Sequence, residues 1–168
     1  EDLELLALAS YFAELLESTS QEGEDAADLL SLLLNSLYAL DTLKKPKELV
    51  KAAFELRLMT LTGYEPLLDG CTVCGLPEPE EPRLHLKQGV LHCARCRGAL
   101  GDGVSMPLSP AALAAARHIV SGNPRKLFSF SLAPESMGLL GDAAEAFLMT
   151  QQERGFRTLD YYKQLLRV

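Results

Sequence analysis

The 168-residue chain contains few of the β-branched residues that favour strands. It has one Ile and six Val against 35 Leu. Branching at Cβ restricts a side chain within a helix and suits a pleated strand, whereas Leu keeps more rotamers open in a helix. With 48% hydrophobic and 23% charged residues, the chain has the composition of an ordinary globular domain. We therefore predict a mostly α fold and exclude a β-sandwich or β-barrel.

Long hydrophobic runs and a basic N-terminal region are also missing. No apolar run reaches the roughly 18 residues that a membrane span needs, so we expect no membrane partner. The first thirty residues contain no Lys or Arg, which argues against a secretory signal. The chain starts at Glu1 without a Met and enters an apolar-periodic segment at once, so we expect native residues to precede it.

Positive charge is absent from the first quarter of the chain. Residues 1–43 contain ten acidic side chains and no basic one, and residues 44–168 contain all 16 basic side chains. The net charge of −7 does not suggest a nucleic-acid-binding protein, but local basic patches can form after residue 43. Solvated helix faces of mixed sign are the alternative interpretation of these charges.

Apolar residues repeat at helical spacing in three segments before residue 64. The first predicted helix covers 3–18, and the second begins at Asp25 or Asp28 and runs to about residue 43. The third begins near Pro46, which suits a first turn, and ends at Gly63, which suits a C-terminal cap.

Three further helices are predicted near the end of the chain. Ser is common at helix N-caps and Pro in the first turn, so Ser109 and Pro110 predict the start of a helix that runs to about residue 121. A second helix begins at residue 134, and a third covers 158–166. Short connections between the helices favour a bundle.

Residues 64–108 differ from the rest, since they lack helical periodicity and contain all four cysteines. The apolar segments 84–86 and 90–92 flank the turn Lys87-Gln88-Gly89, which predicts a short β-hairpin. We predict a helical bundle of residues 1–63 and 109–168 with a small inserted module, residues 64–108.

The four cysteines form two pairs with the spacing of a metal site. Two residues separate Cys71 from Cys74 and Cys93 from Cys96, and eighteen residues separate the pairs. Each short turn aims two sulfurs at one ion, and two such turns complete a tetrahedron of thiolates that suits Zn²⁺ at ~2.3 Å. We predict a structural zinc site with no open coordination position. An iron–sulfur cluster, two disulfides and a redox dithiol are the alternatives.

Basic and imidazole side chains lie beside the cysteines in sequence. Arg95 and Arg97 are expected to offset the charge of about −2 that four thiolates and one Zn²⁺ leave. His92 could replace a cysteine as a ligand, but with four cysteines present we expect it to be a strand residue. His85 alternates with two leucines, which predicts that it faces solvent.

No motif of a catalytic site is present. The GxxxxGK[ST] phosphate loop is missing, and no histidine has a recognisable nucleophile nearby in sequence. Gly98, Gly101 and Gly103 form a glycine-rich stretch without a strand-to-helix frame, so we interpret it as a loop. A metal-dependent hydrolase would need an open metal position. We predict that the protein is not an enzyme.

Tyr11-Phe12-Ala13-Glu14-Leu15 is similar to the Y-x-x-E-L motif of the RecO family of bacterial recombination mediators, and further motifs of that family follow in order. Phe54-Glu55-Leu56-Arg57-Leu58 and the following Leu61-Thr62-Gly63-Tyr64-Glu65-Pro66 are similar to its F-E-x-R-L-L…G-Y-x-P element. The cysteine pairs come next, as in zinc-bearing members. Arg157-Thr158-Leu159-Asp160-Tyr161-Tyr162 resembles its K-S-L-x-F-L motif, with Arg for Lys and Thr for Ser.

The resemblance implies that this chain is the helical and zinc-binding part of such a protein, without the family's N-terminal OB-fold domain. It implies a DNA repair and recombination mediator that binds single- and double-stranded DNA and anneals complementary strands. The implied partners are RecR and single-strand-binding protein, with RecA and RecF as indirect partners. The implied location is the cytoplasm, at the nucleoid. A zinc-ribbon protein-interaction domain that does not bind DNA is the alternative.

Two basic clusters are candidate DNA contacts, because cations pair with phosphates and aromatic faces stack on bases. The first cluster comprises Lys44, Lys45, Lys47 and Lys51, and the second comprises Arg154, Arg157, Lys163 and Arg167, interleaved with Phe156, Tyr161 and Tyr162. The alternative places the aromatic rings in the core and the cations in solvent.

The resemblance also implies a site for the tail of single-strand-binding protein, which is acidic and ends in apolar residues. Such a tail needs a basic residue beside an apolar groove. The candidates in the third predicted helix are Lys51, Phe54, Arg57 and Leu58.

Overall fold

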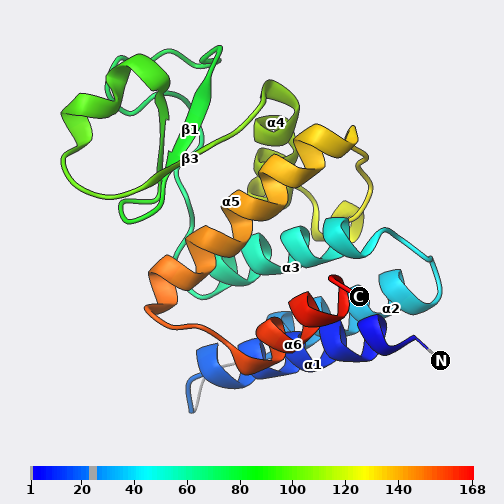
Figure 1. The fold of residues 1–168 in the computed structure, drawn as a ribbon. Coiled ribbons are helices and arrows are strands. Elements are labelled where there is room, and N and C mark those ends of the chain that lie inside the picture. Colours follow the sequence, from blue (N-terminus) through cyan, green and yellow to red (C-terminus); the bar gives the residue numbers. More distant parts are fainter. Residues whose placement is uncertain (1, 23–25) are drawn as a thin grey trace.

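The computed structural model describes residues 2–22 and 26–168, and within these ranges the fold is mostly α (Figure 1). The α-helices are α1 (Leu3–Thr19), α2 (Ala27–Asp41), α3 (Lys47–Leu61), α4 (Pro110–Ser121), α5 (Pro134–Gln152) and α6 (Arg157–Leu165). The strands are β1 (Pro82–His85), β2 (Val90–Cys93) and β3 (Ser105–Pro107), and the 3₁₀ helices are η1 (Ala94–Leu100) and η2 (Pro124–Lys126). Among the described helices, none combines the length and the apolar character needed to cross a membrane.

The predicted helices are confirmed to within a few residues. The Ser109 hydroxyl accepts a hydrogen bond from the amide of Ala112 at 3.0 Å, as expected of a helix cap. Gly63 follows α3 with φ +92°, a value that favours glycine. Asp28 lies in the first turn of α2, and Asp25 lies outside the described residues. Strand β3 and the 3₁₀ helices η1 and η2 were not predicted.

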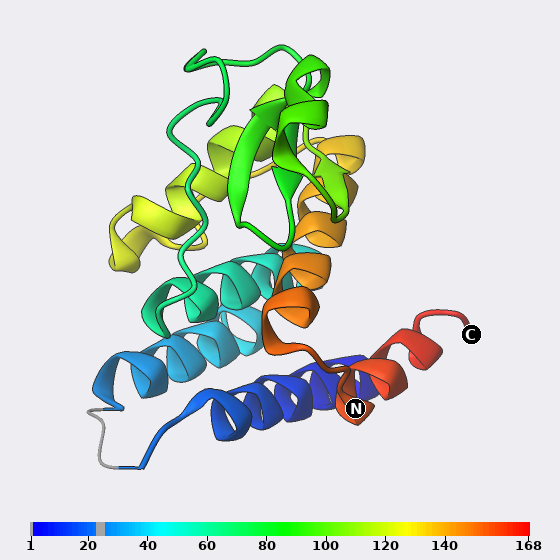
Figure 2. The ribbon, with the colours of Figure 1, turned by 90° about the vertical axis from the view of Figure 1, so that its left-hand side faces the viewer.

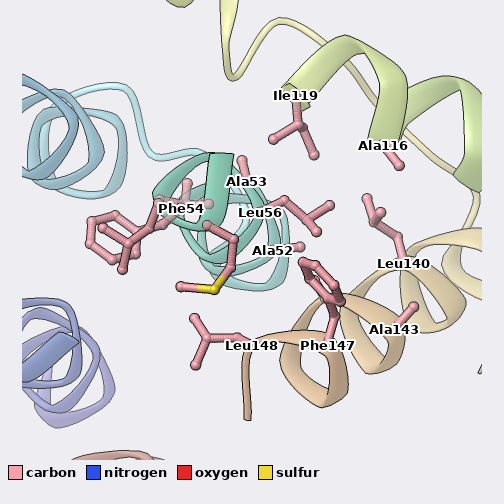
Figure 3. Close-up of a cluster of buried hydrophobic side chains, with 14 of the residues drawn as sticks. Ala52, Ala53, Phe54, Leu56, Ala116, Ile119, Leu140, Ala143, Phe147 and Leu148 are labelled. Atoms are coloured by element: carbon pink, nitrogen blue, oxygen red, sulfur yellow. The ribbon is translucent and has the colours of Figure 1, made fainter. Parts of the chain in front are cut away.

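Helix α3 lies at the centre of the bundle and is buried on all sides. Ten of its residues are buried, namely Leu49 to Leu56, Leu58 and Met59. Figure 3 shows side chains of α4 and α5, among them Ile119, Leu140 and Phe147, directed toward it. On the side of α1, the rings of Phe12 and Phe54 stack with centroids 4.0 Å apart. The position of α3 therefore fixes the positions of the surrounding helices.

A charged network crosses the core beside α3. Glu55 is fully buried, and its carboxylate accepts hydrogen bonds from the Tyr11 hydroxyl at 2.7 Å and the Lys51 ammonium at 3.2 Å. Lys51 also lies 3.5 Å from Glu145, whose other oxygen accepts from Lys163 at 2.7 Å. Burial raises the pKa of Glu55, and the Lys51 ammonium and the Tyr11 hydroxyl oppose that rise. The network thus joins α1, α3, α5 and α6.

The three strands form one antiparallel sheet of order β2-β1-β3. In both ribbon views the sheet and η1 lie at the end of the molecule opposite α1 and α6 (Figures 1 and 2). Leu84, Leu86 and Leu91 from this region join the same hydrophobic cluster as α3 and α5. The sheet is therefore packed onto the bundle through a shared core. The division into a bundle and a module stays a prediction.

Helix α6 packs along α1, although the two are far apart in sequence. Leu159 and Tyr162 are buried, and the ring of Phe156 meets Tyr11 edge-on with centroids 6.1 Å apart. The Thr158 hydroxyl donates a hydrogen bond to Glu14 at 3.0 Å. The C-terminal segment is thus an integral part of the bundle.

We predict that Glu55→Ala destabilises the chain by about 3 kcal/mol, because it opens a cavity, leaves the buried Tyr11 hydroxyl without an acceptor and removes the closest partner of Lys51. Glu55→Gln keeps an acceptor of the same shape, so its cost should be about 1 kcal/mol. Urea unfolding at neutral pH measures both. Glu17→Ala, at an exposed position of α1, is the control and should be within ~0.5 kcal/mol of wild type. Equal stability of Glu55→Ala and wild type would contradict the role assigned to the network.

Candidate metal centre and binding surfaces

The structure brings the four cysteines together. Cys71 and Cys74 lie in the turn before the sheet, Cys93 ends β2, and Cys96 lies in η1. Their four sulfur atoms lie within 4.8 Å of one another, and the Sγ atoms of Cys74 and Cys93 are 3.6 Å apart. A tetrahedral site with bonds of ~2.3 Å separates its sulfurs by about 3.8 Å. The arrangement therefore fits a single tetrahedral metal ion, and all four cysteines are free thiols.

Backbone hydrogen bonds build the turn that holds the first cysteine pair. The amide of Gly75 donates to the carbonyl of Cys71 at 2.9 Å, and the amide of Cys71 donates to the carbonyl of Leu76 at 2.9 Å. Gly75 has φ +76°, which glycine adopts at little cost. The amide of Thr72 donates to the carbonyl of Leu91 in β2 at 2.9 Å, which ties this turn to the strand that ends at Cys93. The hairpin therefore aligns the two pairs, as the sequence predicted.

The sulfurs lie in an environment that favours one thiolate and disfavours several. Burial opposes ionisation of Cys71, but amides of Cys74, Cys93 and Val73 direct their N–H groups at its sulfur and lower its pKa to about 6. Burial and the neighbouring thiols raise the pKa of Cys93 to about 12. Four thiolates at this spacing repel one another, so the cluster needs a bound cation to hold all four in the ionised form.

The two arginines predicted to offset this charge have different roles. Arg95 lies next to the sulfurs, and Cys93 and Cys74 raise its pKa. Arg97 instead donates hydrogen bonds to the carbonyls of Gly101, at 2.7 Å, and Gly103. Arg95 thus faces the thiols, whereas Arg97 closes the glycine-rich loop.

The two histidines of the sheet are both buried. His92 is a strand residue, as expected, with Nδ1 2.7 Å from the carbonyl of Cys93 and Nε2 2.7 Å from the Ser105 hydroxyl. The prediction that His85 faces solvent is wrong. Strand β3 pairs with β1 and brings the loop before it over His85, whose Nε2 lies 3.1 Å from the carbonyl of Asp102.

Arg117 of α4, for which the sequence suggested no role, joins the bundle to the segments on either side of Cys71 and Cys74. Its guanidinium donates to the carbonyl of Leu68 at 2.9 Å and to that of Pro77 at 2.8 Å, and it pairs with Glu78. No local signal in an Ala-rich helix reveals these partners, because they lie about 40 residues or more away in sequence.

The C-terminal basic cluster is partly neutralised. Arg154 lies 3.8 Å from Glu14 and over the ring of Phe156, and Lys163 pairs with Glu145. Within the described ranges, Arg157 and Arg167 form no ion pair and are exposed. Phe156 and Tyr162 are buried in the core, whereas the ring of Tyr161 is half exposed.

The lysines at the junction of α2 and α3 differ in exposure and in their ion pairs. Lys47 pairs with Asp2 at 2.9 Å and Glu4 at 3.0 Å, so it helps to fix the start of α1. Lys44 is exposed and lies 3.9 Å from Asp41, and Lys45 is half-buried.

The residues predicted to bind a protein tail support the core in this structure. Phe54 and Leu58 are fully buried, and Lys51 belongs to the charged network. Arg57 is half-buried and donates to the carbonyls of Ile119 and Val120 at 3.3 and 3.0 Å. Arg57 lines a surface pocket of about 150 Å³ with residues of α2, whereas Lys51, Phe54 and Leu58 are buried, so the four side chains do not form one groove.

An apolar groove lies instead between the start of α3 and the start of α5. It has a volume of about 440 Å³, and its lining includes Leu49, Phe130, Leu132 and Met137, with Lys45 at its edge. The sequence analysis missed it. The signal was the alternation of apolar residues at 128, 130 and 132 just before α5.

Comparison with known proteins connects this fold to one family. The family model "Recombination protein O C terminal" matches residues 1–160. The chain is 31% identical to a DNA repair protein RecO of Acetivibrio thermocellus, over 99% of this chain and 66% of the relative. It is 27% identical to the one of Alkaliphilus metalliredigens (98% of this chain, 67% of the relative) and 34% identical to that of Anaeromyxobacter sp. strain K (88% and 57%). The chain thus spans about two thirds of the length of the first two of these curated relatives.

We predict that the purified chain binds one metal ion, measured by elemental analysis, and that Cys74→Ser weakens binding at least tenfold. Cys74 is exposed, so this change removes a ligand with little effect on packing. Removal of the metal by a chelator should increase amide exchange in residues 71–104 and leave α1 and α6 protected, because coordination provides part of the folding energy of that region. Thr72→Ser, at an exposed neighbour, is the control. Disulfides in the freshly purified chain, or full metal content in Cys74→Ser, would contradict the assignment.

Proposed function

The chain belongs to the RecO family, and from that premise we propose that it is the helical and metal-binding part of a DNA repair and recombination mediator. The match of the family's C-terminal model to residues 1–160 carries this proposal. We propose that the protein acts by binding and annealing DNA strands in the cytoplasm, at the nucleoid, and that it performs no catalytic step. RecR, RecA and RecF are proposed partners for which we assign no surface.

We propose that the metal is Zn²⁺. Four thiolates suit its tetrahedral preference, and four protein ligands leave no position for a substrate. Its proposed role is structural, since the ion joins the turn before β1, the end of β2 and η1. The residues that would hold it are Cys71, Cys74, Cys93 and Cys96.

We propose that α6 offers the main DNA contact of this part of the protein. Arg157, the first residue of α6, and Arg167, two residues after its end, are exposed and unpaired within the described ranges. The half-exposed ring of Tyr161 lies on α6 between them in sequence. Lys45 and Lys44 can extend the contact, because Lys47 holds their segment against the start of α1. Asp2 and Glu4 there line one surface hollow together with Leu165 and Val168 at the end of the chain. Cations at such positions pair with phosphates, and an aromatic face can stack on a base.

We predict that Arg157→Ala with Arg167→Ala weakens binding to single-stranded DNA about tenfold and reduces the slope of log Kd against log salt by about 1.4, or 0.7 for each lost phosphate contact. The measurement is fluorescence anisotropy at several salt concentrations, followed by the rate of annealing of complementary strands, which should fall in parallel. Arg125→Ala with Lys126→Ala removes the same charge from exposed positions of η2 and should leave both quantities unchanged.

Two outcomes would overturn this proposal. If the two double variants reduce the salt slope equally, the effect is one of net charge and α6 is not the contact. If the metal-loaded wild-type chain binds neither single- nor double-stranded DNA, the zinc-bearing protein-interaction domain becomes the better interpretation.

We further propose that the acidic, apolar-ended tail of single-strand-binding protein docks in the groove between the starts of α3 and α5. Phe130, Leu132 and Met137 offer the apolar lining, and Lys45 offers a cation at the edge, which is the chemistry that such a tail needs. Glu48 also lines the groove, so the acidic part of the tail is expected on the side of Lys45.

We predict that Lys45→Glu with Met137→Glu weakens binding of a fluorescent peptide, taken from the C-terminus of the organism's single-strand-binding protein, at least tenfold. Lys126→Glu with Leu67→Glu makes the same change at exposed positions away from the groove and should bind normally. Arg57→Ala should also bind normally. Unchanged affinity of the groove variant, or loss of binding in a folded Arg57→Ala chain, would contradict the groove.

A further inference from the structure

The four cysteines of the metal centre differ in how far solvent reaches them. Cys71 and Cys93 are only 3% and 6% exposed, Cys96 is half-buried, and Cys74 is exposed. All four are thiolates once a metal is bound, so exposure decides which of them a dissolved oxidant reaches. Cys74 is therefore the ligand that is most open to oxidation.

A surface hollow beside the cysteines restricts which oxidants come near. It has a volume of about 390 Å³, and its lining includes Cys93, Arg95, Glu80 and Glu81. The two glutamates form no ion pair in the described part of the chain. Their charge disfavours an anionic oxidant such as oxidised glutathione, whereas a small neutral hydroperoxide is not repelled.

The Sγ atom of Cys93 lies 3.6 Å from that of Cys74, close enough to form a disulfide with it after a small movement. A disulfide bond is about 2.05 Å long, so the two sulfurs need to approach by about 1.5 Å. The sulfur of Cys71 is less free, because it accepts a hydrogen bond from the amide of Cys93 at 3.3 Å. The geometry thus favours a bond between the two cysteine pairs over a bond within one pair.

We propose that Cys74 is a site of oxidation by hydroperoxides, that Cys93 converts the oxidised side chain to a disulfide, and that this modification releases the metal. The inference rests on the proposed metal site and uses no residue of the DNA contact on α6. A centre that is structural while reduced thereby becomes a reversible sensor of peroxide.

The reaction uses one hydroperoxide for each disulfide. The Cys74 thiolate attacks one oxygen of hydrogen peroxide, the O–O bond breaks, and the products are a sulfenic acid and hydroxide. The Cys93 thiolate then attacks the sulfur of the sulfenic acid, which forms the S–S bond and releases a second hydroxide. Two electrons pass from the two sulfurs to the peroxide, and protons from solvent convert both hydroxides to water.

The surrounding structure confines the consequence to one end of the molecule. Two ligands remain, which is too few for a closed tetrahedral site, and η1 has no buried residue that would hold it in place without the metal. The anchors outside the site do not depend on the metal, since Leu84 and Leu91 belong to the core of the bundle and Arg117 binds backbone carbonyls on either side of the first cysteine pair. Oxidation therefore loosens η1 and the first cysteine turn while the helices stay folded.

The test treats the zinc-loaded chain with excess hydrogen peroxide and follows zinc release with a chromogenic chelator, after subtraction of the rate without peroxide. Wild type should release the ion, and dithiothreitol with added Zn²⁺ should restore it. Cys74→His keeps a ligand but removes the exposed thiolate, so its release should be about tenfold slower. Cys96→His leaves the same number of thiolates and is the matched control, with a rate within about twofold of wild type.

Trypsin distinguishes the possible disulfides after the free thiols have been alkylated. Cleavage after Arg95 places Cys93 in peptide 88–95 and Cys96 in peptide 96–97, and both other cysteines lie in peptide 58–83. The expected product joins peptides 58–83 and 88–95, and fragmentation between Cys71 and Cys74 should assign the bond to Cys74. Amide exchange in the oxidised chain should increase in residues 71–104 and stay unchanged in α1 and α6.

Several outcomes would overturn the proposal. If the two histidine variants slow the release equally, Cys74 is not the oxidised ligand. A first disulfide within either Cys-x-x-Cys pair would exclude Cys93 as its partner, and release by oxidised glutathione as fast as by hydrogen peroxide would contradict a hydroperoxide as the oxidant. A chain that holds no zinc before oxidation would refute the metal site itself, and this inference with it.

Discussion

The complete burial of α3, together with the charges that it carries into the core, determines how the other helices are arranged. A helix with ten buried residues needs neighbours on every side, and α1, α2, α4 and α5 provide them. Because Lys51 and Glu55 are buried with it, these neighbours must also provide polar partners, and Tyr11 and Glu145 do so. A buried ion pair is costly to desolvate and adds little net stability, but each charge is very costly to leave alone. The network therefore restricts the packing of α1 and α5 more sharply than apolar contact alone.

The cysteine-bearing region obtains its position from the bundle and its local geometry from the thiols. Leu84, Leu86 and Leu91 extend the core of the bundle, and Arg117 of α4 holds the carbonyls of Leu68 and Pro77 on either side of the first cysteines. The segments that carry the cysteines contribute few apolar side chains of their own to this core. In η1, which contains Cys96, no residue is buried. A bound metal replaces the missing core there. Loss of the ion is thus expected to loosen one end of the molecule and to leave the helices folded.

The sequence predicted the α-helices and the clustering of the four cysteines, because each of these signals is local. Leucine periodicity defines a helix within one segment, and a Cys-x-x-Cys pair fixes two ligands within one turn. Strand β3 could not be predicted from local sequence, since Ser105, Met106 and Pro107 form a strand only by pairing with β1. His85 appeared exposed for the same reason. Lys51 and Arg57 had the pattern of a basic face on α3, but their partners lie up to 94 residues away, at Glu145, and 62 and 63 residues away, at Ile119 and Val120. A buried charge and a surface charge are indistinguishable until those partners are placed.

Several acidic side chains in the first quarter of the chain pair with residues from later segments. Asp2 and Glu4 hold Lys47, and Glu14 accepts from Thr158 and lies near Arg154, so much of the charge of α1 fixes the start of α3 and the approach to α6. Lys47 and Arg154 are partly neutralised by these contacts, which leaves fewer free cations for a DNA-binding patch. Among the described residues, the cations without an ion pair include Arg157 at the start of α6 and Arg167 just after its end, whereas Lys163 of α6 is paired with Glu145. The net charge of −7 therefore does not indicate the local charge of the surface around α6. The internal ion pairs determine which basic side chains remain available to a phosphate backbone, and these include Arg157 and Arg167 at the two ends of α6.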